Sequence, residues 1–264
     1  MAASKTAAEI GVEHRGHVAV VLLRRPEALN AITKAMADRL SAVLGELGSD
    51  RETWVVVLTA EDGRAFCAGA DLAERDSMSP DELSARRASL RQLFASVRDV
   101  PQPTVAAVFG YVLGGGFELA LSCDLVVAAE DSVFGLPETQ VGLVPAGGGT
   151  LLLTRALGAA RAKELIFTGR RLDASAALVQ GLVTQVVPRE RLNDAAMELA
   201  ERITRSSPTA TRLAKAAIRR AQAAEEAVAI EAEEEALARA NRSLDAAEGL
   251  RAFAEKRRPE WVNE

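Results

Sequence analysis

The sequence predicts an α/β fold in which parallel strands are covered by helices. Short apolar runs rich in β-branched residues alternate with stretches of helical periodicity along the first part of the chain. These runs are continuously apolar, which is typical of strands buried on both faces of a sheet. The later part of the chain becomes almost wholly helical. We therefore expect an α/β core over residues 1–200 and a helical region over residues 201–264.

Four apolar runs are expected to form the strands. The run at residues 18–23 ends shortly before Pro26, and a proline cannot donate the hydrogen bond that would extend a strand. Runs at residues 54–59 and 104–109 have the same character, and each leads into a loop that contains glycine. A fourth run covers residues 125–128. Strand, loop and helix thus follow one another as expected of an α/β domain.

Helix signals accompany these strands. Between residues 32 and 47, apolar residues recur at helical spacing and share one face. Ser79, Pro80 and Glu82 combine an N-cap, a proline at the first helical position and a capping box, which predicts a helix running toward residue 97. Further helices are predicted over residues 117–122, after the N-cap Asp173, and from Pro208 through a region rich in Ala, Glu, Arg and Leu.

Composition and charge narrow the classes of function. The chain has 264 residues, of which 48% are hydrophobic, and this is enough for a sizeable core. A net charge of −5 and the lack of a Lys/Arg-rich run before residue 255 argue against nucleic acid as a partner. The N-terminus lacks the apolar core of a signal peptide, and no apolar stretch is long enough to span a bilayer. We expect a cytoplasmic protein that binds neither nucleic acid nor membrane.

Several kinds of catalytic site are disfavoured because the residues they need are missing. The two histidines, His14 and His17, both fall near the first strand, and no His/Cys spacing suits a zinc site. Cys67 and Cys123 are too few for a disulfide framework, and Cys67 has no neighbouring His or Lys to activate a thiolate. Neither a P-loop nor a G-x-G-x-x-G fingerprint is present. The sequence therefore offers neither a His/Cys zinc site nor a nucleotide-binding fingerprint.

Two glycine-containing loops are suited to hold one negatively charged oxygen. The first spans residues 66–72 and the second spans residues 110–118, and their small residues let backbone N–H groups approach a ligand closely. Glu118 and Glu138 follow in otherwise apolar surroundings. Two N–H donors combined with two carboxylates predict chemistry through an enolate, in which a thioester oxygen becomes negatively charged.

Seven short motifs follow one another along nearly the whole chain. They are RPEALNA at residues 25–31, AFCAGADL at residues 65–72, PTVAAV at residues 103–108, GGGFE at residues 114–118, FGLPE at residues 134–138, GGGT at residues 147–150 and FAEKR at residues 253–257. Taken together in this order, they resemble the enoyl-CoA hydratase/isomerase family, the crotonase superfamily.

The resemblance implies a crotonase-like spiral of ββα units, with a C-terminal helical region that builds a homotrimer or a dimer of trimers. It also implies an acyl-CoA substrate from fatty acid or other lipid metabolism and no metal or redox cofactor. Residues 66–78 and 162–173 resemble methylglutaconyl-CoA hydratases in particular. That subgroup includes RNA-binding members with a lysine-rich first helix. RNA binding is not expected here, because the corresponding helix at residues 33–45 has only Lys34 and Arg39.

Within these motifs, the resemblance implies that the backbone N–H groups of Ala70 and Gly115 form an oxyanion hole. It implies that Glu118 positions and activates a water molecule for attack at C3, and that Glu138 supplies the proton to C2. Two close carboxyl groups in an apolar pocket cannot both ionise easily, so one of them is expected to be protonated. Ala146 stands where the family often has glycine, and its methyl group is expected to crowd the pocket.

The resemblance also implies contacts to coenzyme A from six residues. These are Ala28, Ala68, Asp71, Leu72, Phe253 and Lys256. The adenine is expected near the Ala68 carbonyl and the pantetheine along the first loop. Phe253 and Lys256 are expected to reach the nucleotide from the C-terminal helix of an adjacent subunit, where a lysine suits a phosphate.

The leading hypothesis is an enoyl-CoA hydratase, a lyase that adds water reversibly across the C2–C3 double bond of a 2-enoyl-CoA thioester. The presence of both glutamates favours it. Two alternatives stay open. One is a Δ3,Δ2-enoyl-CoA isomerase, in which a single glutamate shuttles the proton, and the other is a non-catalytic acyl-CoA-binding protein on the same fold.

Overall fold

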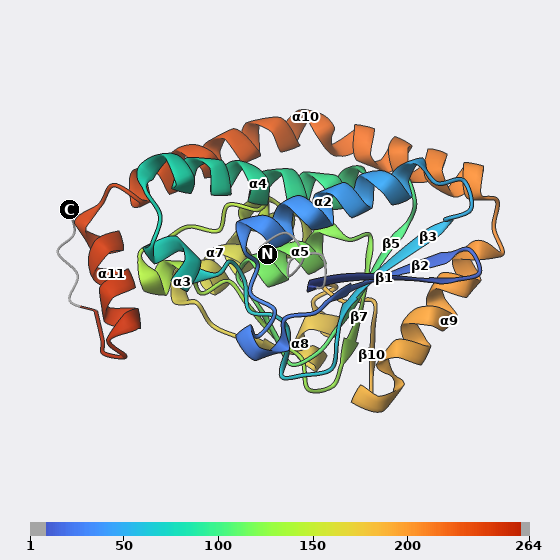
Figure 1. Ribbon diagram of the computed structural model, residues 1–264, viewed down its shortest axis with the longest axis horizontal. Coiled ribbons are helices and arrows are strands. Elements are labelled where there is room, and N and C mark those ends of the chain that lie inside the picture. The colour runs from blue at the N-terminus through green and yellow to red at the C-terminus, as the bar shows by residue number, and fades with distance from the viewer. Residues whose placement is uncertain (1–8, 260–264) are drawn as a thin grey trace.

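The computed structural model describes residues 9–259, and within them the strands form two sheets, as Figure 1 shows in part. The larger sheet has the spatial order β1 (Ile10–Arg15), β2 (Val18–Leu23), β3 (Val55–Ala60), β5 (Thr104–Val108), β7 (Leu125–Ala129) and β10 (Gln185–Val187). The smaller sheet has the order β4 (Ala65–Cys67), β6 (Tyr111–Leu113), β8 (Val133–Gly135) and β9 (Leu172–Asp173). The N-terminal segment, in which the sequence indicated no signal peptide, lies largely outside the described residues.

Helices connect and cover these strands. In chain order they are η1 (Pro26–Ala28), α2 (Lys34–Ser49), α3 (Leu72–Asp76), α4 (Pro80–Asp99), α5 (Gly115–Ser122), η2 (Glu138–Val141), α6 (Gly149–Leu157), α7 (Ala159–Thr168), α8 (Ala174–Val179), η3 (Arg189–Arg191), α9 (Leu192–Thr204), α10 (Pro208–Ala240) and α11 (Leu244–Ala254). Figure 1 shows α10 at the top, along α4 and α2, and α11 at the left. Across residues 9–259, no helix has both the length and the apolar character of a membrane span.

The predicted burial of the sheet is confirmed. Every residue of β3 and of β5 is buried, and the two strands pair in parallel. α9 packs against β3, β5 and β7, so helices cover the apolar sheet and exclude water from it. The predicted α/β class is therefore confirmed.

The predicted helix starts are confirmed where capping residues mark them. The Ser79 side chain accepts from the Glu82 N–H, and the Glu82 side chain accepts in return from the Ser79 N–H, which completes the capping box of α4. Asp173 caps α8, and α10 begins at Pro208. The helical C-terminal region is divided, however, because Ser243 caps a second helix, α11.

Three successive stretches of chain share one order of elements. Each begins with a strand of the larger sheet, continues with a strand of the smaller sheet, and ends in a helix: β3–β4–α3, β5–β6–α5 and β7–β8–η2. This is the spiral of ββα units that the resemblance implied. The repeat matters for function because β4, β6 and β8 end at the same edge of the smaller sheet.

The C-terminal helical region lies along the core of its own chain. On α10, Lys215 Nζ lies 2.7 Å from Asp124 Oδ2, and Arg219 Nη2 lies 2.7 Å from Asp99 Oδ1. α11 packs on η2. The division of the chain near residue 200 and the contribution of this region to a trimer stay predictions.

Candidate active site

The predicted site residues follow the short strands of the smaller sheet. β4, β6 and β8 are parallel, so their carboxyl ends lie at one edge. Ala70 follows β4, Gly115 follows β6 and Glu138 follows β8. The fold therefore brings both loops and the second glutamate together at this edge.

The backbone N–H of Ala70 faces away from the neighbouring chain segment. Ile32 N donates to the Gly69 carbonyl over 2.8 Å, and Asp71 N donates to the Ile32 carbonyl over 2.9 Å, in a parallel bridge. Extended backbone alternates the direction of its hydrogen-bonding groups, so the N–H of Ala70 points to the opposite side. That side is a cavity, which Ala70 lines.

Gly115 supplies the second N–H as the first residue of α5. The N–H groups of a first helical turn have no acceptor within the helix, and the helix dipole favours an anion beside them. A Cβ placed on Gly115 would lie 3.5 Å from Ala70 N, so the two amides border the same small volume. Over residues 9–259, neither N–H donates to a protein acceptor.

Glycine at position 116 allows α5 to lie this close to β4. A Cβ on Gly116 would lie 2.1 Å from the Cys67 carbonyl oxygen, so a side chain would push the helix away. Cys67 itself is buried, and burial raises the pKa of its thiol to about 12. A neutral thiol agrees with the prediction that Cys67 packs as a small apolar residue rather than acting as a nucleophile.

Glu118 lies about one turn into α5 and is only 3% exposed. Its Oε1 accepts hydrogen bonds from Gly147 N over 2.7 Å and from Gly149 N over 2.8 Å. Burial raises the pKa of Glu118, while these two hydrogen bonds and the positive charge of Arg98 oppose the shift. Glu118 therefore exchanges its proton at a higher pH than an ordinary glutamate, which suits an acid–base group.

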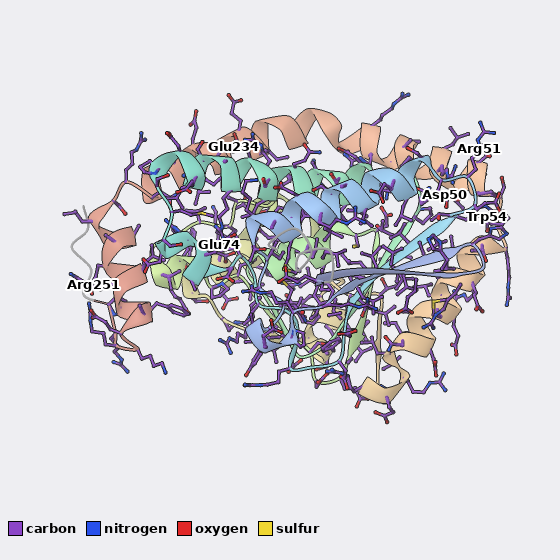
Figure 2. The ribbon with its side chains drawn as sticks, in the orientation of Figure 1. Asp50, Arg51, Trp54, Glu74, Glu234 and Arg251 are labelled. Atoms are coloured by element: carbon purple, nitrogen blue, oxygen red, sulfur yellow. The ribbon has the colours of Figure 1, made fainter. Side chains whose placement is uncertain are left out.

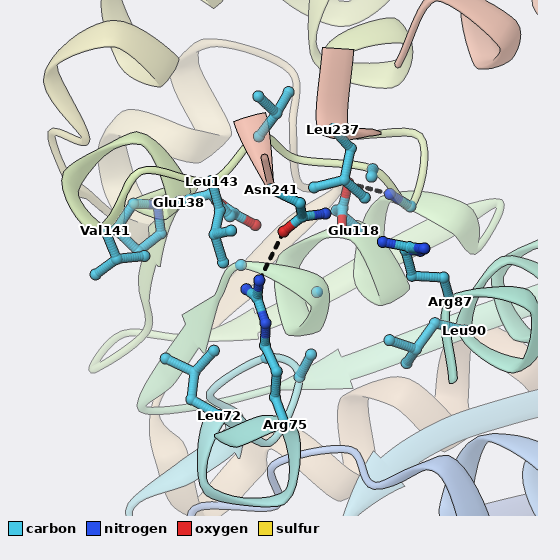
Figure 3. Close-up of a pocket in the computed structure, with 18 of the residues that line it drawn as sticks. Leu72, Arg75, Arg87, Leu90, Glu118, Glu138, Val141, Leu143, Leu237 and Asn241 are labelled. Carbon is cyan, nitrogen blue, oxygen red and sulfur yellow. Dashed lines mark hydrogen bonds between the residues drawn. The ribbon is translucent and has the colours of Figure 1, made fainter. Parts of the chain in front are cut away.

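Glu138 begins η2, and its neighbours hold this short helix in place. Thr139 Oγ1 donates to the Ile166 carbonyl over 2.7 Å. The Glu138 carboxylate faces the second loop, because a Cβ on Gly114 would lie 3.1 Å from Glu138 Oε1. Figure 3 shows Glu138 and Glu118 in the same cavity.

These groups line one cavity of about 890 Å³, a size typical of ligand-binding pockets. Ala146, singled out from the sequence, also lines it. Of the predicted site residues, the lining includes Ala68, Ala70, Leu72, Gly115, Glu118, Glu138 and Phe253. Two carboxylates and two backbone N–H groups thus line one space, an arrangement suited to enolate chemistry on a thioester.

Three of the predicted coenzyme A contacts lie outside this lining: Ala28, Asp71 and Lys256. Asp71 caps α3 by accepting from Glu74 N over 3.0 Å, and its Oδ2 accepts from Arg25 Nη1 over 2.6 Å. Although burial favours the neutral acid, these bonds hold the pKa of Asp71 below its usual value. Asp71 therefore shapes the first loop. Lys256 is exposed in the turn after α11.

Phe253 lines the cavity of its own chain. The contact with the site of an adjacent subunit that the resemblance implied stays a prediction. The break after α10 lets α11 fold back onto η2, and Gly249 permits close contact, since a Cβ there would lie 2.6 Å from the Val141 carbonyl carbon. Arg257, beyond the end of α11, donates from Nη1 to Glu248 Oε1 over 2.6 Å and from Nη2 to Glu248 Oε2 over 3.0 Å, and Glu248 lies within α11. This ion pair holds Arg257 at the cavity.

The histidines lie away from the cavity. His17 stacks on Trp54, with ring centroids 3.7 Å apart. Figure 2 shows Trp54 at the opposite end of the molecule from Arg251 of α11. Neither His14 nor His17 lines the cavity, which agrees with the prediction that they are not catalytic.

Several residues of the site are not among those predicted from the sequence, and four of them bear on its chemistry. Gly147 and Gly149 belong to a motif that the resemblance highlighted, but the direction of their N–H groups depends on the folded path of the chain. Arg75 and Arg87 line the cavity from α3 and α4. The predicted helix from residue 80 contained a signal for Arg87, because Arg87 and Arg91 lie four residues apart and share a face.

Comparison with known proteins shows the family to which the chain belongs. The family model described as Enoyl-CoA hydratase/isomerase matches residues 13–264. The chain belongs to the enoyl-CoA hydratase/isomerase family. This family acts on CoA thioesters, and membership confirms the resemblance and the crotonase-type fold that were predicted from the motifs.

Individual members of the enoyl-CoA hydratase/isomerase family are similar over most of their length. The chain is 42% identical over 239 residues to the probable enoyl-CoA hydratase 2, mitochondrial, of Arabidopsis thaliana, covering 90% of this chain and 79% of the relative. It is 38% identical over 269 residues to the mitochondrial methylglutaconyl-CoA hydratase of Mus musculus, covering 98% of this chain and 85% of the relative. A crystal structure of enoyl-CoA hydratase from Bacillus anthracis matches with a TM-score of 0.80 and 40% identity, covering 97% of this chain and 100% of that one.

Proposed function

We propose that this chain is an enoyl-CoA hydratase, which adds water reversibly across the C2–C3 double bond of a 2-enoyl-CoA thioester. The observation that carries the proposal is the position of two glutamates beside two converging backbone N–H groups in one cavity. Family membership supports the CoA thioester as the substrate class. Hydration uses both glutamates, whereas isomerisation needs only one.

The N–H groups of Ala70 and Gly115 would bind the thioester oxygen. As water adds to C3, electrons of the double bond move toward C1 and the oxygen gains negative charge. Preorganised donors stabilise this charge, and removal of one such donor typically costs about 2.7–4 kcal/mol of transition-state stabilisation. The N-terminal position of Gly115 in α5 adds the favourable field of the helix dipole.

The two carboxyl groups would manage the protons. Ionised Glu118, supported by the Gly147 and Gly149 amides, takes a proton from water while the water oxygen bonds to C3. Protonated Glu138 gives its proton to C2, which restores the thioester carbonyl. The product is a 3-hydroxyacyl-CoA, and transfer of one proton from Glu118 to Glu138 returns the site to its starting state. These steps use no metal or redox cofactor.

We also propose that Ala68, Leu72 and Phe253 contact the CoA thioester, since all of them line the cavity. The chain is proposed to act as a homotrimer or a dimer of trimers. Leu213 and Ile218 of α10 support contact with a neighbouring copy, because they are 64% and 63% exposed although apolar. Light scattering of the purified protein tests this assembly.

Crotonyl-CoA tests the activity. A hydratase removes the absorbance of the conjugated enoyl thioester and forms 3-hydroxybutyryl-CoA, which mass spectrometry identifies. An isomerase would instead convert 3-enoyl-CoA to 2-enoyl-CoA with no change in mass. Tight binding of acyl-CoA without turnover of either substrate would overturn the proposal and favour a binding protein.

A further inference from the structure

The motif at residues 25–31 takes no part in the proposed steps, yet its backbone is held in an unfavourable conformation. Leu29 and Asn30 are both left-handed, each with a φ of 53°. This region disfavours residues that carry a side chain, asparagine less than most, and it persists only where surrounding contacts hold it. The contacts that hold this turn also reach the first loop of the site.

The Asn30 side chain holds the turn from inside the protein. Asn30 is 0% exposed, so it cannot contact a substrate. Its Oδ1 accepts from Arg25 N over 2.8 Å, and its Nδ2 donates to the Ala65 carbonyl over 2.9 Å. An amide supplies both an acceptor and a donor, so it satisfies these two backbone groups at once. Because Ala65 begins β4, the amide joins the turn to the strand that leads into the first loop.

The backbone on either side of Asn30 pairs with the first loop. Ala68 N donates to the Leu29 carbonyl over 3.0 Å, and this hydrogen bond adds to the two already described at the Ile32 bridge. Together these hydrogen bonds hold the loop both before and after Ala70. The turn around Asn30 therefore determines the direction in which the Ala70 N–H points into the cavity.

Arg25 makes a second connection from the same turn to the first loop. Its backbone N–H is held by Asn30, and its Nη1 donates to the Ala31 carbonyl over 2.9 Å and to Asp71 Oδ2 over 2.6 Å. Asp71 directly follows Ala70, and its side chain is only 10% exposed. The position of this largely buried ion pair thus depends on the backbone path that Asn30 sets.

We propose that Asn30, together with Arg25, is a positioning residue for the oxyanion hole, because it fixes the turn that aims the N–H of Ala70 at the thioester oxygen. The inference rests on the oxyanion hole of the proposed function. Hydrogen-bond donors stabilise a developing charge best when they are held in place beforehand, and a misplacement of about 1 Å can cost roughly 100-fold in rate. Asn30 acts through Ala70 and does not contact the substrate.

Infrared spectroscopy of a bound thioester tests this inference without any reaction. The probe is butyryl-CoA with a heavy isotope at its carbonyl carbon, since this thioester is saturated and cannot be hydrated. Hydrogen bonds to a carbonyl oxygen weaken its double bond, so binding to the wild-type protein should lower the stretching frequency. Asn30→Gly permits the left-handed backbone but removes both side-chain hydrogen bonds. We expect the frequency in this variant to return most of the way to its value in solution.

Kinetics with crotonyl-CoA give a second readout. Asn30→Gly should lower kcat roughly 10- to 100-fold and change KM by less than about 3-fold, because the lost stabilisation belongs to the transition state. Arg25→Met, whose native side chain is partly exposed, should fold and shift both the frequency and kcat in the same direction, by a smaller amount.

A matched control separates positioning from general loss of stability. Gln102 is likewise a fully buried amide, and its Nε2 donates to the Leu47 carbonyl over 2.8 Å and to the Thr53 carbonyl over 3.2 Å. It lies outside the cavity lining. Gln102→Ala should therefore lower the melting temperature, as Asn30→Gly should, and leave the carbonyl frequency and kcat unchanged.

Two outcomes would overturn the inference. The first is a carbonyl frequency that stays at the wild-type value in both Asn30→Gly and Arg25→Met. The second is a Gln102→Ala variant that shifts the frequency as much as Asn30→Gly does. The proposed function fails separately: a frequency that depends on Asn30 without hydration of crotonyl-CoA contradicts the hydratase alone, and hydration with a frequency independent of Asn30 contradicts the inference alone. A wild-type protein that binds butyryl-CoA without lowering the frequency contradicts both.

Discussion

Gly149 N donates to Glu118 Oε1 over 2.8 Å, and it can do so only because residue 149 has no side chain. A Cβ at that position would lie 2.8 Å from the same oxygen and 3.0 Å from Leu136 Cδ1. The turn before α6 is therefore shaped around a buried carboxylate. Such close support for one buried acid is expected where its protonation is used in chemistry.

Replacement of Glu118 by glutamine should remove activity and leave the fold intact. Glutamine cannot take a proton from water, so we expect kcat for crotonyl-CoA to fall roughly 100-fold or more. Its side-chain oxygen still accepts from Gly147 and Gly149, so packing is kept. Glu138→Gln should reduce kcat similarly by removing the proton donor. Near-normal turnover by either variant would contradict the assigned roles.

The same Glu118→Gln variant should be at least as heat-stable as the wild type near pH 8. Because burial raises the pKa of Glu118, the folded protein holds this proton more tightly than the unfolded chain does. At pH values above the pKa that Glu118 has in the folded protein, the ionised carboxylate therefore lowers the free energy of unfolding. Below the ordinary glutamate value of 4.5 the acid is protonated in both states, and the advantage of glutamine should vanish. Thermal unfolding scans at several pH values measure this.

The pH dependence of kcat/KM should reveal how the positive charge of Arg98 affects the pKa of Glu118. Activity requires ionised Glu118, so it should fall as the pH decreases through a pKa above 4.5. Arg98 opposes the upward shift, so Arg98→Met should raise the pKa of Glu118 and move the acid limb to higher pH. Arg98→Lys, which keeps the charge, should move it less. An acid limb that stays in place in Arg98→Met would show that Arg98 has no electrostatic role.

Gly116→Ala should be strongly destabilising. The added methyl group would meet the Cys67 carbonyl at 2.1 Å, and neither backbone segment can move without displacing the oxyanion donors. We expect a loss of about 3 kcal/mol in the free energy of unfolding and of most activity. Gly45→Ala is the matched control, because nothing lies within 4 Å of its Cβ and it sits within α2. It should stabilise the protein by about 0.5–1 kcal/mol in urea titrations.

Glu248→Gln should weaken substrate binding more than catalysis. Glu248 is buried and holds Arg257 at the cavity through two hydrogen bonds, which lose their charge assistance in the variant. We expect KM to rise roughly 10-fold with kcat little changed. Glu255→Gln serves as the control, since Glu255 is an exposed partner of the same arginine and should matter little. Equal effects from both variants would contradict a specific role for Glu248.

Elements with local signals were predicted well from the sequence. The strand at residues 18–23 is β2 with the same bounds, and the start of α4 is confirmed because its capping box involves residues only three apart. The smaller sheet was not predicted. β4, β6 and β8 have three residues each, too few for periodicity, and their pairing depends on partners distant in the sequence.

In the site, too, local motifs were predicted from the sequence, whereas contacts between distant segments were not. The glutamates and the two glycine loops were visible as motifs, and the structure brings them into one cavity. The partners of Glu118 were not visible, since Gly147 and Gly149 reach it only through tertiary folding. The reversal between α10 and α11 at Ser243, which lets Phe253 line the cavity of its own chain, was not predicted, because it depends on tertiary contacts.

The short helix α5 carries both Gly115 and Glu118, so an oxyanion donor and a proton acceptor are mounted on one rigid unit. Arg75 and Arg87, which also line the cavity, belong instead to α3 and α4. Evolution or design can therefore exchange side chains of α3 and α4 to accept new acyl groups while the reactive geometry is inherited unchanged. A single ancestral catalyst with this layout would be able to diversify its substrates without reinventing its chemistry.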